Sequence, residues 1–260
     1  MSDFIGTKLT MNLGERSYDI ILKNGALENL YQFARLDRKV AVVTDSGVPA
    51  QYAQRVADQC RDAVIITVPQ GEASKSFKIL ETVLKQMLDF HMGRGDLVVA
   101  VGGGVVGDLA GFAASIYMRG IDFINCPTTT LSMIDSSIGG KTAVDLGDTK
   151  NIVGAFWQPK LVIVDPDTLA TLPRRHFING LAEAVKASLL ADPELFAIFE
   201  KGDIDGQINE IIYRSLRFKK NIVEQDETEH GMRKALNFGH TIGHGIEAVK
   251  GIKGRRTVGL

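Results

Sequence analysis

Five short apolar runs, separated by stretches of helical periodicity, most constrain what this chain of 260 residues can fold into. They span residues 40–44, 63–69, 96–101, 121–126 and 161–164. Short apolar runs that alternate with helices are typical of a parallel sheet covered by helices on both faces. We therefore predict an α/β fold whose N-terminal part, residues 1–170, is a Rossmann-like parallel-sheet domain. Two alternating runs around Gly14–Arg16 predict a β-hairpin at its start.

The pattern changes after Pro173, where apolar residues recur with the 3.6-residue period of a helix. The periodic segments are residues 181–190, 193–200, 207–227 and 233–250. We predict an all-α domain at residues 171–260, and hence a domain boundary near residue 170.

Charge and composition exclude several classes of protein. A formal net charge of −1 offers no basic excess for nucleic acid or an anionic membrane surface. No run reaches the roughly 18 apolar residues of a transmembrane helix, and the start of the chain lacks the regions of a signal peptide. Cys60 and Cys126 form no disulfide or metal-binding spacing. We expect reduced thiols and a cytoplasmic protein that binds neither membranes nor nucleic acid.

The strongest local motif is the sequence Gly-Gly-Gly-Val-Val-Gly-Asp at residues 102–108. It follows the third predicted strand and opens a helix, as the G-x-G-x-x-G turn of dinucleotide-binding proteins does. Glycines there let the backbone approach a diphosphate, which then lies at the N-terminus of the helix. The motif predicts a diphosphate site, and the alternative is a tight turn whose glycines serve packing alone.

Polar loops follow several predicted strands at their carboxyl ends, where open α/β sheets bind ligands. Residues 70–75 follow the second strand and residues 127–130 follow the fourth. Lys141 lies in a Gly-Lys-Thr segment, but Asp135 replaces the first glycine of a P-loop, which excludes that motif. Each loop alone is explained by helix capping, whereas several loops at one edge favour a binding site.

Two histidines one helical turn apart, His240 and His244, project from one face of a predicted helix. Such a pair can converge on a metal or a substrate. Arg233 and Asn237 fall on the same predicted face. A helix face composed of these side chains predicts one side of an active site.

Glu183 and Lys186 are spaced i, i+3 on the first helix of the predicted second domain. This spacing commonly marks a surface ion pair. The apolar neighbours of the pair favour a partly buried cleft instead. In such a cleft, Glu183 and His240 suit a catalytic zinc, which needs one further protein ligand and an open position.

Together these motifs resemble the 3-dehydroquinate synthase family of sugar-phosphate cyclases over essentially the whole chain. The matching segments are residues 71–75, 102–108, 127–129, 135–142, 150–156, 181–186 and 237–244. The resemblance implies NAD and a divalent metal (zinc, with cobalt as an alternative) as cofactors, a sugar phosphate as substrate, and a homodimer. The implied NAD site comprises Asp45, Glu72, Lys75, Gly104, Val105, Val106, Gly107, Asp108, Thr128, Thr129, Lys141, Lys150, Thr168 and Thr171.

The resemblance also implies the substrate and metal residues. Lys141, Asn151, Lys219, Arg233 and Asn237 would hold the phosphate and carboxylate of the substrate. Lys186 and His244 would lie beside the reacting carbon skeleton. Glu183 and His240 would ligate the metal.

The family converts 3-deoxy-D-arabino-heptulosonate 7-phosphate to 3-dehydroquinate and phosphate in the shikimate pathway. The implied steps are transient oxidation by NAD, β-elimination of phosphate, reduction, and an intramolecular aldol closure. The family pattern also places a third zinc-binding histidine in a His-Gly-Glu segment, whereas this sequence reads Arg-Arg-Thr-Val-Gly-Leu at residues 255–260. We therefore expect a truncated helical domain whose metal site lacks one ligand.

Three alternatives stay open at the level of sequence. The first is a sibling cyclase that closes a different ring from another sugar phosphate. The second is an NAD- and metal-dependent alcohol dehydrogenase, which would accumulate NADH. The third is an inactive fragment that binds NAD and retains no metal.

Overall fold

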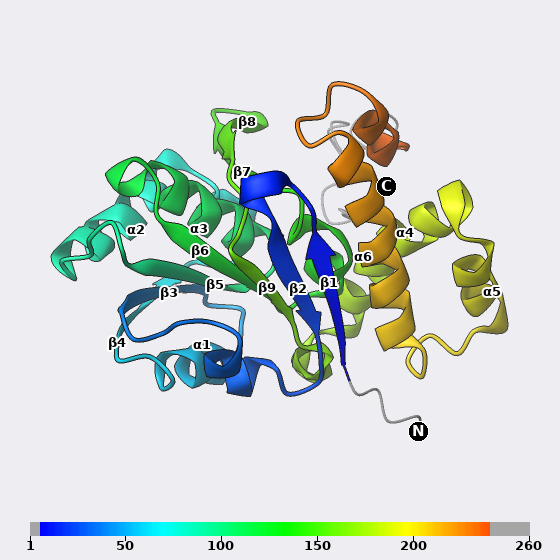
Figure 1. Cartoon of the computed structure of the whole chain (residues 1–260), viewed down its shortest axis with the longest axis horizontal. Helices are drawn as coiled ribbons and strands as arrows, with labels where there is room; N and C mark the ends of the chain where they lie inside the picture. The colour runs from blue at the N-terminus through cyan, green and yellow to red at the C-terminus, as the bar shows by residue number, and fades with distance from the viewer. Residues whose placement is uncertain (1–5, 240–260) are drawn as a thin grey trace.

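A computed structural model describes residues 6–239 of the chain (Figure 1). Its centre is a seven-stranded sheet with the strand order β1-β2-β9-β6-β5-β3-β4. The strands are β1 (Thr7–Met11), β2 (Tyr18–Leu22), β3 (Lys39–Asp45), β4 (Asp62–Val68), β5 (Leu97–Gly102), β6 (Asp122–Pro127) and β9 (Leu161–Val164). β1 pairs antiparallel with β2, and the other neighbours are parallel. The prediction of a parallel-sheet α/β fold that starts with a hairpin is confirmed.

Both faces of the sheet are covered. Helix α1 (Ala50–Ala57) covers one face, and α2 (Phe77–Asp89) and α3 (Gly104–Ile116) cover the other (Figure 1). On β3, Val42 belongs to the hydrophobic core under α1, and Val43 belongs to the core under α2 and α3. Because successive side chains of a strand point to opposite faces, a continuous apolar run needs cover on both.

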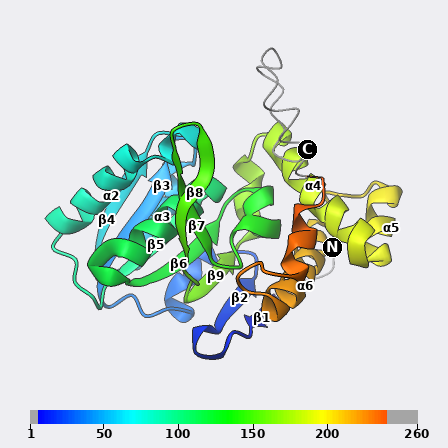
Figure 2. The ribbon, with the colours of Figure 1, turned by 90° about the horizontal axis from the view of Figure 1, so that it is seen from above.

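Three helices form a layer beyond β1, at one end of the sheet (Figure 2). They are α4 (Arg174–Ala191), α5 (Pro193–Lys201) and α6 (Ile208–Gln225). The carboxylate of Asp192 caps α5 by accepting a hydrogen bond from Leu195 N at 3.0 Å. The predicted helices of this region are confirmed up to α6. None of the helices in the described part of the chain has the length and apolar character needed to span a membrane.

The three helices share one hydrophobic core with the N-terminal hairpin. Its buried members include Ile20 of β2, Val162 of β9 and Leu216 of α6. The expected domain boundary near residue 170 falls in a 3₁₀-helix, η6 (Pro166–Thr171). Because the same core continues across that point, the division into two domains stays a prediction.

One element was not predicted from the sequence. Residues expected to form loops make a two-stranded antiparallel hairpin, β7 (Lys141–Leu146) and β8 (Thr149–Phe156). It lies against α3, on the α3 side of the large sheet (Figure 1). Lys141 therefore begins a strand instead of lying in a loop.

The helix predicted from Arg233 differs as well. The described part of that segment is a 3₁₀-helix, η7 (Met232–Asn237), followed by a turn, so the prediction of an α-helix is wrong there. With three residues per turn, positions i and i+4 point roughly 120° apart. Arg233 is accordingly buried and Asn237 is exposed.

Candidate active site

Polar side chains gather at the edge of the sheet where the parallel strands end. β3 ends at Asp45, whose Oδ1 accepts hydrogen bonds from Gly47 N (2.7 Å) and Val48 N (3.2 Å). These bonds fix the carboxylate at the edge of the sheet. A fixed carboxylate at this position suits the ribose hydroxyls of a dinucleotide, and Asp45 was predicted to belong to the NAD site.

The glycine-rich turn joins β5 to α3 at the same edge. Gly103 is the N-cap of α3, and no side chain caps the helix there, so its first N–H groups can meet an anion. Ser136 Oγ is buried without a hydrogen-bond partner, 3.0 Å from where a Cβ on Gly104 would lie. At Gly107, a Cβ would lie 3.0 Å from the Asn125 side chain. The residues therefore fit a bound diphosphate, while Gly107 also serves close packing.

Threonines occupy the adjoining loops. Thr128 N donates to Gly102 O at 2.9 Å, which holds the loop after β6 beside the glycine turn. The hydroxyls of Thr171 and Tyr52 lie 3.0 Å apart. The structure thus brings most of the predicted cofactor residues to one edge. They are Asp45, Gly104, Val105, Val106, Gly107, Asp108, Thr128, Thr129, Thr168 and Thr171.

Lys75 links this edge to the β7–β8 hairpin. Its side chain is almost fully buried, and Nζ donates to Asp108 at 2.6 Å and to Asn151 Oδ1. Burial raises the pKa of Asp108, and the Lys75 charge opposes that rise. Asn151 was predicted on the substrate side and Lys75 on the cofactor side, so the two predicted sites adjoin. Lys150, the neighbour of Asn151, is exposed.

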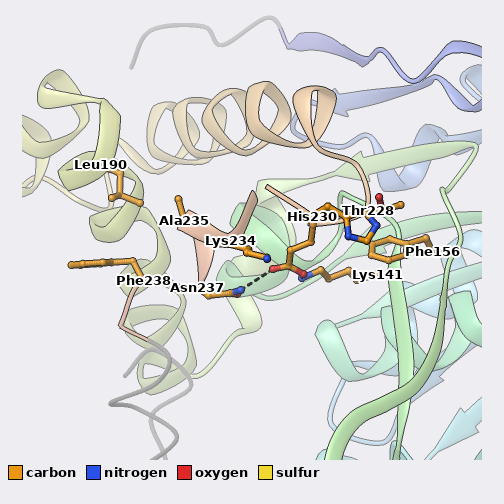
Figure 3. A pocket seen from close by; sticks show the side chains of 10 residues that line it. Lys141, Phe156, Leu190, Thr228, His230, Lys234, Ala235, Asn237 and Phe238 are labelled. Carbon is orange, nitrogen blue, oxygen red and sulfur yellow. Dashed lines mark hydrogen bonds and ion pairs between the residues drawn. The ribbon is translucent and has the colours of Figure 1, made fainter. Parts of the chain in front are cut away.

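A cavity of about 860 Å³ lies between the β7–β8 hairpin and the segment after α6 (Figure 3). Its polar lining includes Lys141, Glu229, His230 and Asn237. Lys141 forms an ion pair with the Glu229 carboxylate, and Asn237 Nδ2 donates to the same carboxylate at 2.7 Å. The structure therefore brings together two residues predicted to hold the substrate, and adds an acidic residue that was not predicted.

Glu229 is presented by a strained turn. Its φ of 63° is left-handed, which is uncommon for a residue with a side chain. The Asp226 carboxylate holds the turn by accepting three backbone N–H groups at 2.7 to 3.0 Å. Burial disfavours the charged form of Glu229, but hydrogen bonds from Lys141 and Asn237 outweigh it and lower its pKa. Glu229 therefore stays ionised at neutral pH.

Arg233 lies behind the lining of this cavity, with 1% of its surface exposed. Its Nη2 donates to Gly139 O at 2.9 Å, and its Nη1 donates to Glu227 O. The guanidinium lies 5.7 Å from the centre of the Phe156 ring. Burial lowers the pKa of Arg233, and the charge of Glu229 opposes the shift. Contact of Arg233 with a substrate stays a prediction.

A second, small cavity lies between α4 and α6. Lys219 lines it and donates to Asp135 O at 2.7 Å, with an ion pair to Asp135 Oδ1 at 2.8 Å. Burial lowers the pKa of Lys219, and Asp135 opposes the shift. Lys186 pairs with Glu183 in the same lining and donates to Leu236 O at 2.5 Å. The pair is buried, so the cleft that the sequence favoured over a surface ion pair is present.

The predicted metal site is described only in part. Glu183 is in place beside Lys186, whereas His240 and His244 lie outside the described residues. Within residues 6–239, no three His, Cys, Asp or Glu side chains are grouped so as to hold a metal ion. Glu183 supplies a carboxylate suited to a divalent cation, and the complete ligand set stays a prediction.

Two solved structures place the fold in a class. A 2-deoxy-scyllo-inosose synthase complexed with carbaglucose-6-phosphate, NAD+ and Co2+ matches with a TM-score of 0.82 and 26% identity, over 93% of this chain and 69% of that one. A 2-epi-5-epi-valiolone synthase from Streptomyces hygroscopicus subsp. jinggangensis 5008, with NAD+ and Zn2+ bound, matches with a TM-score of 0.81 and 30% identity, over 91% and 69%. The fold is therefore that of the sugar-phosphate cyclases.

Sequence comparison defines the family within this class. The family models described as 3-dehydroquinate synthase N-terminal and 3-dehydroquinate synthase C-terminal match residues 65–179 and 180–256. A 3-dehydroquinate synthase from Pelobacter propionicus is 42% identical over 256 residues, which are 94% of this chain and 71% of that protein. This chain belongs to the 3-dehydroquinate synthase family, so the resemblance found in the sequence is confirmed.

Proposed function

We propose that this chain converts 3-deoxy-D-arabino-heptulosonate 7-phosphate to 3-dehydroquinate and phosphate. The observation that carries the proposal is the convergence of Lys141 and Asn237 on one carboxylate in a cavity large enough for a sugar phosphate. A cation and an amide donor that already hold one anion suit a substrate with a carboxylate and a phosphate. The family membership supplies the reaction.

NAD would be held at the carboxyl edge of the sheet, with its diphosphate at the N-terminus of α3 and a ribose at Asp45. Glu183 and His240 would hold the divalent metal, zinc or cobalt. When bound, NAD would supply reversible hydride transfer with the substrate, and the metal would supply polarisation of the oxygen at the same carbon.

The side chains of the chain itself would orient the substrate and handle its charge. Lys141, Asn151 and Asn237 would bind the phosphate, and the positive charge of Lys141 would stabilise it as it leaves during β-elimination. Lys219 and Arg233 would bind the carboxylate.

In this proposal, the Glu183–Lys186 pair on α4 takes part in proton transfer. Lys186 Nζ is held by Glu183 and by the carbonyl of Leu236, so the amine has a fixed position. We assign the reacting carbons of the substrate a place beside it, as the family resemblance implies. A lysine held in this way can hold or move the proton of a substrate hydroxyl. We assign His244 the same task on the substrate side, as the family resemblance implies.

The proposal is tested by supplying heptulosonate phosphate, NAD and zinc and by following phosphate release together with NADH absorbance. Phosphate release without net NADH is expected, because NAD is regenerated in each turnover. Steady accumulation of NADH would instead identify an alcohol dehydrogenase. Binding of NAD with neither signal would identify an inactive NAD-binding protein.

Substrate choice within the class is tested in the same assay. The relatives solved as inosose and valiolone synthases are 26% and 30% identical to this chain, whereas the 3-dehydroquinate synthase from Pelobacter propionicus is 42% identical. We therefore expect faster phosphate release from the heptulosonate phosphate than from glucose 6-phosphate or sedoheptulose 7-phosphate.

We also propose that the protein is a cytoplasmic homodimer. The support is the resemblance to the 3-dehydroquinate synthase family. Light scattering on the purified chain tests the dimer, and a mass equal to one chain at micromolar concentration would contradict it. Cell fractionation tests the location.

A further inference from the structure

The N-terminal hairpin reaches the candidate substrate site although it starts the chain. Tyr18, the first residue of β2, is 4% exposed and lies in the core that the hairpin shares with α4 and α6. Its hydroxyl accepts a hydrogen bond from Gly139 N at 3.1 Å. Gly139 lies two residues before Lys141, so a side chain of β2 directly contacts the turn that leads into the substrate site.

Both backbone polar groups of Gly139 form hydrogen bonds with side chains. Its N–H donates to the Tyr18 hydroxyl, and its carbonyl accepts from Arg233 Nη2 at 2.9 Å. Gly139 and Gly140 have left-handed φ values of 94° and 70°. At Gly139 a Cβ would lie 2.5 Å from Arg233 Nη2, so the close approach of the guanidinium requires a glycine. A left-handed turn of this kind persists only where its surroundings fix it.

A second contact from the hairpin reaches the other side of the same guanidinium. Arg16 Nη2 pairs with Glu227 Oε2 at 2.7 Å, and the carbonyl of Glu227 accepts from Arg233 Nη1. The other oxygen of Glu227 accepts from Gln158 Nε2 at 2.9 Å. Gln158 in turn packs against Gly140. The two acceptors of Arg233 belong to Gly139 and Glu227, and each of these residues contacts a side chain of the hairpin.

We propose that Tyr18 is a positioning residue for the substrate site, and that Arg16 has the same role with a smaller effect. Tyr18 fixes the peptide of Gly139, and through it the direction of Lys141 and the place of the Arg233 guanidinium. The inference rests on the proposed function in one respect, namely that Lys141 and Arg233 hold the acidic groups of the substrate.

The difference between the two residues follows from burial. Loss of the Tyr18 hydroxyl would leave a buried N–H without a partner, which costs more than the net value of an ordinary hydrogen bond. Arg16 has 67% of its side chain exposed, so its ion pair is screened by water. Burial also raises the pKa of Tyr18, so the phenol stays neutral at the pH of these measurements.

An ordinary core tyrosine is the competing explanation. In that case the ring fills space and a phenylalanine would serve as well. Tyr18→Phe separates the two, because it keeps the ring and removes only the hydroxyl. Tyr117→Phe is the matched control, since the Tyr117 hydroxyl donates to Met92 O at 3.0 Å, away from the cavity.

The expected result for Tyr18→Phe is a rise of roughly tenfold in KM for the heptulosonate phosphate, with a smaller change in kcat. The Kd for NAD should change much less than KM, because Tyr18 does not contact the cofactor edge and acts on the implied NAD site through Lys141 alone. Hydrogen–deuterium exchange at the Gly139 amide should quicken by a similar factor. Tyr117→Phe should change neither KM nor the exchange at Gly139, and Arg16→Gln should raise KM by about twofold at most.

Each outcome bears on the proposal. Unchanged exchange at Gly139 and unchanged KM would overturn it, even where the melting temperature falls, because a purely structural tyrosine predicts that result. If the wild-type chain releases no phosphate from the sugar phosphate, the proposed function fails separately. Titration with inorganic phosphate then decides the inference: weaker binding by Tyr18→Phe than by wild type supports it, and equal binding overturns it.

Discussion

At the residue scale, an internal carboxylate occupies the place where an acidic substrate is expected to bind. Glu229 pairs with Lys141 and accepts a hydrogen bond from Asn237. An anion that enters the cavity must compete with this carboxylate for the same donors. To enter, an anion must therefore bind Lys141 and Asn237 strongly enough to displace the Glu229 carboxylate.

We expect Glu229→Gln to bind inorganic phosphate about fivefold to tenfold more tightly than wild type at neutral pH, because one negative charge is removed beside the site. Isothermal titration at low salt measures the change. The matched control is Glu194→Gln, since Glu194 pairs with Arg214 on the surface with 78% of its side chain exposed. Weaker binding by Glu229→Gln would mean that the carboxylate orders the donors instead of competing for them.

Lys219 gives a prediction for pH. Burial lowers its pKa below the ordinary value of 10.5. Its charge is present below that lowered pKa, so anion affinity should fall as pH rises through it, earlier than for an exposed lysine. The folded state also binds fewer protons than the unfolded state between the two values, so the contribution of Lys219 to the free energy of unfolding rises with pH in that window. Measurements of KM for the heptulosonate phosphate between pH 7 and about 10 test this, because the substrate carboxylate is assigned to Lys219, and Lys219→Arg should flatten the rise in KM.

The lysines and amides of the site were predictable, whereas some of their acidic partners, such as Glu229, were not. Lys141 and Asn237 lie in motifs that mark the family, and Lys219 was among the substrate residues that the resemblance implies. Asp135 was used only to exclude a P-loop and to begin a segment that matches the family, although it pairs with Lys219 across 84 residues of sequence. This pair depends on how α6 packs against the helical turn η5 (Ser132–Ser136), and no local pattern of residues encodes that packing.

At the scale of elements, strands and helices were predictable where a long apolar pattern was present. The β7–β8 hairpin was missed because most of β8 is exposed, which leaves no apolar alternation to detect. The helix predicted from Arg233 fails for a local reason. The Asp226 carboxylate takes backbone N–H groups at the start of that segment and so favours a turn followed by a 3₁₀-helix.

Gly180 on α4 provides a test of packing between elements. A Cβ at this position would lie 2.3 Å from Leu131 N, and the backbone at Leu131 can move away only at a cost in free energy. Alanine is favoured over glycine in a helix by about 1 kcal/mol, but the clash should outweigh this gain. We expect Gly180→Ala to lower the free energy of unfolding by about 2 kcal/mol in urea titrations.

The control for that change is Gly95→Ala, because Gly95 has open space around its missing Cβ. It should alter the free energy of unfolding by less than about 0.5 kcal/mol. Gly180 also lies one turn before Glu183, so the substitution should weaken metal-dependent activity more than NAD binding. Equal stability of the two variants would mean that α4 can move away from Leu131 without loss.

At the scale of the whole molecule, the shared core argues that sheet and helices unfold together. Leu216 of α6 is fully buried in the core that includes Ile20 of β2 and Val162 of β9. Trp157, the one tryptophan of the chain, packs against the core on the α2 and α3 side. Its fluorescence therefore reports on a part of the molecule that Leu216 does not contact.

We expect Leu216→Ala to cost about 2–5 kcal/mol of the free energy of unfolding. The transitions seen by circular dichroism and by Trp157 fluorescence should move together, because the hairpin couples the helices to the sheet. Two separate domains with a boundary near residue 170 predict otherwise. In that case the circular dichroism transition would split and the fluorescence midpoint would stay at its wild-type value.

The position of the hairpin also has a consequence for biosynthesis. β2 pairs with β9, so β1 and β2, which are synthesised earlier, cannot join the sheet until residues 161–164 have emerged. At a common rate of translation this takes roughly ten seconds. During that interval Ile20, Ile21 and Leu22 lack both their sheet partner and their core. The nascent chain should therefore bind a chaperone at this segment, and release it once β9 and the helices α4 to α6 have been made.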